Sequence, residues 1–223
     1  LVPPVQQAPA AVGAEPHPSR EAGHRSLVRE VVETALLAIL VFLAVRASVQ
    51  HYRVDGQSME PSLADGEFLL VNALLYDRFD IQAGARWVPS WDPGEPAERH
   101  VFHGPRRGDI VILHHPASAE ARDLVKRVIG LPGERLRIEA GVVYINDREL
   151  LEPYVKEPWL GDLTEITIPP GSYFVMGDNR NNSLDSRIFG PIDEDLIVGK
   201  AMASWWPRDR FGRVPNQEPE LAP

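Results

Sequence analysis

The chain has 223 residues, with 23 Lys or Arg against 32 Asp or Glu, so its formal net charge is −9 at pH 7. This acidic balance argues against a protein whose task is to grip nucleic acid, because no basic excess is available to neutralise phosphates. With 43% hydrophobic and 25% charged residues, the composition is that of a folded protein with one main domain and appendages. The absence of cysteine excludes disulfide frameworks, cysteine-ligated zinc, iron–sulfur clusters and thiol catalysis.

The chain begins with a stretch that is poor in residues able to pack. Residues 1–26 are rich in Pro and Ala, so we expect a disordered tail there. The character changes over residues 27–50, within which Thr34–Val45 carries no charge and is apolar on every face. Glu33 and Arg46 stand at the ends of that run, where long side chains can reach the headgroup region. We therefore predict a transmembrane anchor helix over residues 27–50.

Two other interpretations of residues 27–50 stay open. Twelve uncharged residues are also compatible with a buried helix of a soluble protein. A cleaved secretory signal peptide would need small residues three and one positions before the cut, and Ala47 and Val49 meet that need only weakly. For an uncleaved anchor, the arginines on its two sides give a slight bias toward a cytoplasmic N-terminus, with Arg20, Arg25 and Arg29 before it and Arg46 and Arg53 after it.

After the anchor, short runs rich in β-branched and aromatic residues alternate with Gly and Pro. The predicted strands are Phe68–Asn72, Asp109–Leu113, Arg135–Ile138, Val142–Ile145, Glu165–Ile168 and Tyr173–Met176. Helices and strands do not alternate, so the fold class we predict is mainly β, an antiparallel sheet domain over residues 51–207. Residues 77–105 are expected to form an irregular insertion. Residues 208–223 are polar and contain Pro, and we expect a second disordered tail.

The common metal, nucleotide and hydrolase motifs are missing from the sequence, which leaves a less common Ser-Lys arrangement open. The histidines show no metal-ligand spacing such as HExxH, and GxGxxG, P-loop and GxSxG motifs are missing, so we expect neither metal nor cofactor. A serine hydroxyl needs a base, and no histidine stands in a Ser–His–Asp context, which leaves lysine as the substitute. A lysine amine acts as a base only when it is neutral, which burial favours. Lys126 lies within the apolar run Val125–Ile129, although a single lysine in a strand is more often a surface residue.

Four segments agree with one another in order and content. They are Val54–Leu63 (VDGQSMEPSL), Arg107–Val111 (RGDIV), Asp123–Glu134 (DLVKRVIGLPGE) and Met176–Arg187 (MGDNRNNSLDSR). Together with the N-terminal anchor they resemble the boxes of the type I signal peptidases, and the resemblance spans about Val54–Trp206. It implies a serine endopeptidase that removes signal peptides from exported preproteins through an acyl-enzyme. It also implies small substrate residues at −1 and −3, bound as an added strand.

The resemblance also implies roles for single residues. Ser58 matches the acylated nucleophile, Lys126 the general base, and Ser183 the serine that hydrogen-bonds and orients the lysine amine. Asp185 and Arg187 match a supporting pair, which is also expected to be a structural salt bridge. The backbone N–H of Ser58 would supply one oxyanion donor.

The substrate-binding residues are expected around the nucleophile, at Gly56, Gln57 and Met59. Some family members carry a serine where this chain has Gly56, so the second oxyanion donor stays open. Met59 would help to wall the S1 pocket, and a role as core filler fits it equally well.

The interpretation we reach is a single-pass enzyme of the plasma membrane with its catalytic domain on the extracytoplasmic side. Its partners are exported preproteins and the lipid bilayer, and nucleic acid is not among them. Tryptophans that could lie at the membrane interface or in the core are Trp87, Trp91, Trp205 and Trp206. One alternative is a Ser-Lys autoprotease of the SOS-repressor type, which would want a DNA-binding region where residues 1–50 offer an apolar helix. The other alternative is a non-catalytic, membrane-anchored β domain that binds partners.

Overall fold

The chain divides into two units in the computed structural model, Leu1–Val45 and Arg46–Pro223. The structure describes residues 20–76, 78–79, 99–100, 103–116 and 123–222. Residues 1–19 of the predicted tail and most of the predicted insertion at 77–105, including Trp87 and Trp91, lie outside the described residues.

The first described element is helix α1, Arg20–Ser48. It begins inside the predicted tail, so disorder is wrong for residues 20–26, which follow the last proline of that segment and contain no helix breaker except one glycine. The side chains from Val31 to Leu43 are exposed, and most of them are large and apolar. Judged on the described residues, no helix combines the length and apolarity needed to cross a bilayer. The predicted transmembrane anchor over residues 27–50 is therefore not confirmed.

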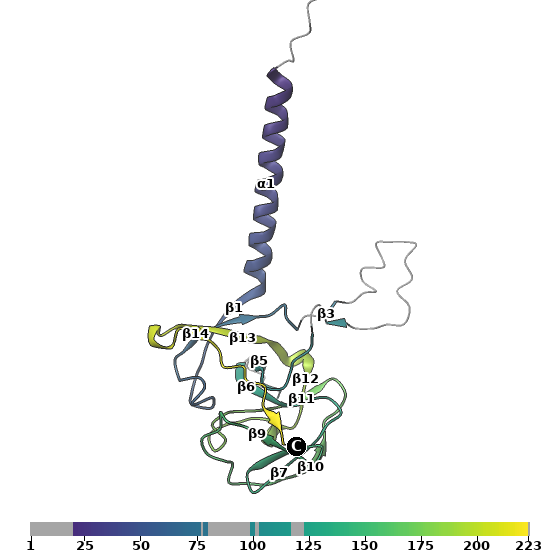
Figure 1. Ribbon diagram of the computed structural model, residues 1–223, viewed down its shortest axis with the longest axis vertical. Helices are drawn as coiled ribbons and strands as arrows, with labels where there is room; N and C mark the ends of the chain where they lie inside the picture. The colour runs from purple at the N-terminus through teal and green to yellow at the C-terminus, as the bar shows by residue number, and fades with distance from the viewer. Residues whose placement is uncertain (1–19, 77, 80–98, 101–102, 117–122, 223) are drawn as a thin grey trace, which may run out of the picture. The chain divides into compact units, whose positions relative to one another are not determined.

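The Arg46–Pro223 unit is built mainly from antiparallel strands (Figure 1). Eight of the described strands form a large sheet in the order β1-β2-β13-β5-β6-β11-β12, with β14 paired to β13. Their bounds are β1 Val49–Arg53, β2 Phe68–Asn72, β5 Ile110–His114, β6 Asp123–Gly130, β11 Ser172–Met176, β12 Ile192–Asp193, β13 Ile197–Trp206 and β14 Gly212–Arg213.

A smaller sheet has five described strands in the order β10-β7-β8-β9-β15. Their bounds are β7 Arg135–Glu139, β8 Val142–Ile145, β9 Arg148–Leu151, β10 Leu163–Thr167 and β15 Glu220–Leu221. The remaining described elements are the paired strands β3 Arg78–Phe79 and β4 Arg99–His100, the short helix α3 Ser186–Phe189, and the 3-10 turns η1 Glu194–Leu196 and η2 Arg208–Arg210. The predicted fold class, mainly antiparallel β, is confirmed.

Burial along the strands explains why these residues pair as they do. In β7 and β8 buried and less buried residues alternate, as expected for a sheet with one covered face. Strand β11 is buried along its whole length, and the last five residues of β6 are buried as well. The base candidate Lys126 therefore lies on one of the most enclosed strands of the large sheet.

The C-terminal segment is ordered, so the predicted disordered tail at 208–223 is wrong for residues 208–222. Val214 is 5% exposed and belongs to a core cluster of the large sheet, while β15 pairs with β9 of the smaller sheet. Composition alone did not indicate this, because the segment is held by backbone pairing with strands that are distant in the sequence. We call residues 214–222 the C-terminal strap.

Candidate active site

Ser58 lies on a closed loop, residues 54–67, between β1 and β2. The base of the loop is held by two backbone hydrogen bonds, from Val54 N to Glu67 O and from Gly66 N to Val54 O, both 2.8 Å. Inside it, the N–H of Gly56 donates to Asp65 Oδ1 at 2.8 Å. These bonds give the loop a defined shape, and we call it the nucleophile loop because it carries Ser58, the predicted nucleophile.

A second set of bonds fixes Ser58 to the loop that follows β11. The N–H of Asn179 donates to Ser58 O at 3.0 Å, and its side-chain amide donates to Gln57 O at 3.1 Å. Among the residues that the structure describes, no acceptor takes the Ser58 N–H. That N–H is therefore available to stabilise an oxyanion.

Lys126 reaches Ser58 from strand β6. It pairs with Val111 of β5, it is 2% exposed, and its Nζ donates to Ser58 Oγ at 2.9 Å and to Val125 O at 2.8 Å. Burial lowers the pKa of Lys126 from 10.5 to about 8, against the opposing effects of the Asp185 and Asp178 carboxylates. At pH 7 such an amine is neutral in about one molecule in ten, against fewer than one in a thousand at the ordinary pKa.

Arg127, the residue after Lys126, connects three segments of the chain. Its guanidinium forms a fully buried ion pair with Asp178, at 2.8 Å from Nε and 2.7 Å from Nη2. It also donates to Ser62 Oγ of the nucleophile loop at 3.2 Å and to Pro215 O of the strap at 3.0 Å. Because the Arg127 charge is matched by Asp178 and its donors find acceptors, the ion pair supports the site without an unpaired buried charge.

Asp185 and Arg187, the predicted supporting pair, are brought together in the structure. Arg187 donates twice to the Asp185 carboxylate, at 2.8 Å from Nε and 2.7 Å from Nη2, and Asp185 also accepts the N–H of Gly177 at 2.9 Å. Arg187 Nη1 donates to Arg180 O at 2.6 Å. The pair thus closes the loop 177–187, and its two charges act on the pKa of Lys126 in opposite directions.

Ser183 lies close to Ser58 without the predicted hydrogen bond to Lys126; Ser58 and Lys126 together are the candidate dyad. Its Oγ is buried and has no hydrogen-bond partner among the described residues. A Cβ placed on Gly177 would come within 2.3 Å of Ser183 Oγ and 2.5 Å of Ser58 O. The Ser183 hydroxyl therefore lies near the backbone of Ser58 and makes no hydrogen bond to Lys126 among the described residues.

The predicted substrate-binding residues fall into two groups. Gly56 and Gln57 are exposed, so both can meet a substrate. Met59 is fully buried in a core cluster with Val54 and Leu63, which matches the alternative of core filler and leaves no surface for an S1 wall.

The sequence analysis did not identify the residues that support the site through backbone contacts or a buried ion pair. Gly177, Asp178 and Asn179 lie in the quoted segment Met176–Arg187, and Arg127 follows the base directly. Their position in those segments was the available signal, but a motif does not say which backbone groups its side chains will hold. Within the described part of the chain, no group of three or more His, Asp or Glu residues could hold a metal ion.

Comparison with known proteins gives the class. The family model for signal peptidase, peptidase S26, matches residues 28–206. Signal peptidase I U of Bacillus subtilis (strain 168) is 35% identical over 195 residues, covering 82% of this chain and 88% of that protein. Signal peptidase I of Bacillus caldolyticus is 36% identical over 190 residues, covering 78% and 90%. A crystal structure of a signal peptidase I from Enterococcus faecalis shares 33% identity and covers 44% of this chain and 97% of that chain, with a TM-score of 0.40.

The chain therefore belongs to the signal peptidase family, peptidase S26. The prediction that it is an enzyme of the signal peptidase I type is confirmed.

Proposed function

We propose that this enzyme cleaves signal peptides from exported preproteins with Ser58 as the nucleophile and Lys126 as the general base. One observation carries the proposal, the 2.9 Å separation of Lys126 Nζ and Ser58 Oγ at a lysine that is 2% exposed. Burial provides what a lysine base needs, because it lowers the pKa of Lys126 to about 8 and makes a neutral amine accessible near pH 7.

The reaction starts when the neutral Nζ of Lys126 takes the proton from Ser58 Oγ. The oxygen attacks the scissile carbonyl carbon, and the N–H of Ser58 donates to the oxyanion that forms. The Lys126 ammonium then gives its proton to the leaving amine, and the signal peptide stays as an ester on Ser58. In the second half, Nζ takes a proton from a water molecule that attacks the ester, and the proton returns to Ser58 Oγ as the acid product leaves.

The substrate is proposed to lie along the exposed side of the nucleophile loop as an extended segment. Gly56 and Gln57 are exposed there, whereas the Gln57 and Ser58 carbonyls are already held by Asn179. An extended peptide adds affinity through main-chain hydrogen bonds, and the resemblance to the family implies small substrate side chains at −1 and −3.

The membrane location is also a proposal, with an anchor over residues 27–50 and the catalytic domain outside the cytoplasm. Two separate observations support it. Helix α1 exposes large apolar side chains, for example Leu36 at 62% and Phe42 at 65%. On the catalytic unit, Trp205, Trp206 and Phe211 are 40%, 48% and 76% exposed, and such aromatic side chains suit a bilayer interface.

The anchor is tested by carbonate washing of membranes from cells that make the full chain. The enzyme should stay in the pellet, while a shortened chain that starts at Ser48 should become extractable and still cleave a peptide substrate in detergent. Recovery of the full chain in the supernatant would exclude the anchor and would leave the dyad untouched.

The dyad is tested by cleavage of a preprotein under single-turnover conditions. Ser58→Ala and Lys126→Ala should lose at least about a thousandfold in rate. Lys126→Arg should be equally inactive, because a guanidinium does not deprotonate in proteins. Lys156→Arg, on an exposed loop residue, is the matched control and should cleave like the wild type. If Lys126→Arg cleaves within tenfold of the wild type, another group takes the Ser58 proton.

A further inference from the structure

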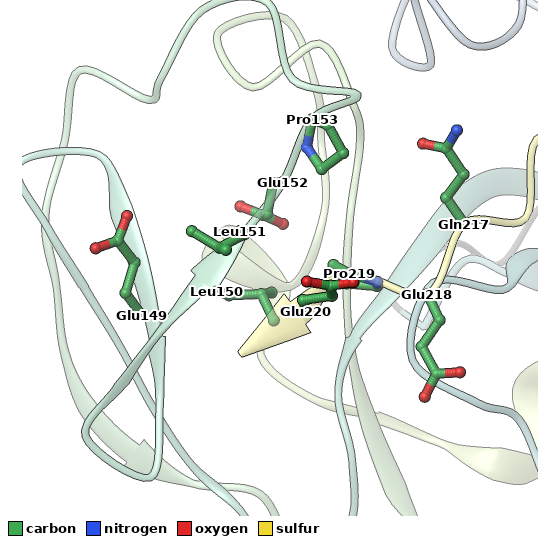
Figure 2. Close-up of a pocket in the computed structure, with 9 residues that line it drawn as sticks. All are labelled: Glu149, Leu150, Leu151, Glu152, Pro153, Gln217, Glu218, Pro219 and Glu220. Carbon is green, nitrogen blue, oxygen red and sulfur yellow. The ribbon is translucent and has the colours of Figure 1, made fainter. Parts of the chain in front are cut away.

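The C-terminal strap connects the two sheets of the catalytic unit. It leaves β14 at Val214, whose N–H donates to Met202 O at 3.1 Å, and it ends as β15 against β9. Gln217–Glu220 of the strap and Glu149–Pro153 line a cavity of about 690 Å³. Figure 2 shows Pro219 and Glu220 beside Leu150 of β9. At its far end, Arg148 holds the strap through the Leu221 and Ala222 carbonyls.

At the near end, the side chain of Asn216 takes the place of a peptide group between two strands. The paired register of β13 and β5 runs to Lys200 opposite Val111, so Ala201 and Ile110 come next in line. There, Asn216 Oδ1 accepts the N–H of Ile110 at 2.7 Å and Asn216 Nδ2 donates to Ala201 O at 2.8 Å. Ile110 and Ala201 are both 0% exposed, so water does not replace these bonds in the folded protein.

This bridge lies level with the dyad. Ile110 pairs with Arg127 on β6, and the next pair along the same two strands is Val111 with Lys126. Pro215, the neighbour of Asn216, accepts from the Arg127 guanidinium at 3.0 Å. The strap therefore touches the β5–β6 pair at the residues directly beside the base.

The strap also meets the other side of the dyad through the core. Val214 belongs to the same buried cluster as Met59, which follows Ser58 in the chain. Gly108 lies in the turn that precedes β5, and a Cβ on it would come within 2.0 Å of Gln217 O in the strap. Because the backbones of Gly108 and Gln217 are in close contact, the strap cannot move toward β5 without moving the turn that precedes β5.

We propose that Asn216 is a positioning residue for the reaction of Ser58 and Lys126. The Asn216 amide completes the β13–β5 ladder at the level of Lys126. By doing so it excludes water from β6 and keeps Lys126 Nζ within hydrogen-bond distance of Ser58 Oγ. The proposal rests on the proposed function of the dyad. Without the amide, a buried N–H and a buried carbonyl lose their partners, so the strand end opens or takes up water.

A variant in which Lys126 is hydrated should differ in the pKa of Lys126 from a variant that is only less stable. The charged groups that act on its amine are Asp185, Asp178 and Arg187, all on the segment after β11. Asn216 is uncharged, so replacing it with Ala changes none of those charges. Any upward movement of the pKa of Lys126 in Asn216→Ala therefore reports lost desolvation rather than a lost charge.

The experiment measures kcat and KM of the full-length enzyme on a synthetic preprotein peptide from pH 6 to pH 10. For Asn216→Ala we expect kcat at pH 7 to fall about ten- to a hundredfold, with KM within about threefold. The acidic limb of kcat should move up by about one pH unit. Asn216→Ser, which keeps one polar group and adds no charge, should lie between Asn216→Ala and the wild type and carries the test if the alanine variant does not fold.

Two controls separate positioning from stability. Gln217→Ala changes the neighbouring exposed side chain of the strap and should behave like the wild type. Val143→Ala removes core volume from the smaller sheet at a 1% exposed residue of β8 that pairs with β7 and not with the strap, so it should lower the melting temperature without moving the acidic limb. The proposal is overturned if Asn216→Ala keeps the wild-type acidic limb, or if Val143→Ala reproduces its kinetic defect. Failure of the dyad itself has a different signature, which is cleavage by Lys126→Arg.

Discussion

The carbonyl oxygen of Ser58 accepts the backbone N–H of Asn179 at 3.0 Å, so the nucleophile is held by a loop that comes about 120 residues later in the chain. The Asn179 side chain makes a second bond, to Gln57 O at 3.1 Å. Ser58 Oγ is thus positioned from two directions, by the closed loop 54–67 and by the turn after β11. A change at the junction of these two segments should affect catalysis before it affects the rest of the fold.

Gly177 occupies that junction. A Cβ at this position would lie 2.5 Å from Ser58 O and 2.3 Å from Ser183 Oγ, closer than real Cβ contacts come. Gly177→Ala should therefore move the Ser58 backbone, lower kcat by about a hundredfold or more and cost about 1–3 kcal/mol of stability. Single-turnover cleavage and thermal unfolding measure the two effects.

The control for this substitution is Gly212→Ala, because a Cβ at Gly212 meets nothing within 4 Å. It should leave both the rate and the melting temperature close to those of the wild type. If Gly177→Ala cleaves at the wild-type rate, the junction is more adaptable than the close approach of these atoms indicates.

Ser183→Ala should be a mild variant. The Ser183 hydroxyl is buried without a partner among the described residues, so its removal should leave the melting temperature unchanged or slightly raised. Lys126 Nζ already has two acceptors, Ser58 Oγ and Val125 O. Ser58 Oγ is esterified in the acyl-enzyme, and there Ser183 can serve as the replacement partner. We expect a two- to tenfold loss of rate, about the worth of one neutral hydrogen bond, concentrated in deacylation.

Separate measurement of the amine and acid products tests this timing. A loss that falls equally on both products would show that Ser183 acts before acylation. Inactivity as complete as that of Ser58→Ala, in a folded protein, would show that the bond to Lys126 forms throughout the cycle.

Local pattern was a good guide to the core strands and a poor one to the segments that join them. The run Asp109–Leu113 predicted a strand that the structure places at Ile110–His114. The apolar neighbours of Lys126 made burial plausible, and the lysine is 2% exposed. The strap is different, because Asn216 is held by Ile110 across 106 residues of sequence. The partners of the Asn216 side-chain amide are backbone groups of distant strands, and no periodic pattern of side chains in the strap indicates such contacts.

The active site shows the same division. The resemblance to the family predicted that Ser58, Lys126, Asp185 and Arg187 share one site, because each lies in one of the matching segments. Side-chain orientation did not follow from the motif, since Ser183 does not bond to Lys126 and Met59 is buried. Such details depend on rotamers and on space left by neighbours such as Gly177, which a linear pattern does not contain.

The backbone conformation at position 56 explains why this residue is a glycine. Its φ is +89°, in the region that L side chains rarely adopt, although a Cβ there would meet nothing within 4 Å. Gly56→Ser and Gly56→Ala should each cost about 1–2 kcal/mol of stability through backbone strain. Because the strain is shared, the ratio of their rates isolates the serine hydroxyl as an added oxyanion donor.

We expect Gly56→Ser to cleave faster than Gly56→Ala and to stay within about tenfold of the wild type. The measurement is kcat/KM for the three enzymes on one preprotein, with unfolding curves to confirm equal destabilisation. Equal rates for the two variants would mean that a hydroxyl at this position does not reach the oxyanion.

The pH dependence of cleavage tests the electrostatics of the base. With the pKa of Lys126 at about 8, kcat/KM should rise about tenfold per pH unit up to pH 7.5 and level off above pH 8.5. The same burial has a consequence for stability, since the folded state binds fewer protons than the unfolded state between pH 8 and pH 10.5. Stability should therefore increase as the pH rises through that window, and the penalty for burying the ammonium is fully present below pH 8.

Lys126→Met measures that penalty independently of activity. The substitution removes the buried charge and keeps an unbranched side chain, so at pH 7 the variant should be more stable than the wild type by up to about 3 kcal/mol, the value that corresponds to a pKa of about 8 instead of 10.5. The advantage should shrink as the pH approaches 10.5, because the wild-type amine is then neutral in both states. Urea unfolding of the two proteins at pH 7 and pH 10 gives the comparison, with the exposed Lys156→Met as the control that shows no such change. An acidic limb of kcat/KM near pH 8 without a pH-dependent gain in Lys126→Met would assign the limb to a group other than Lys126.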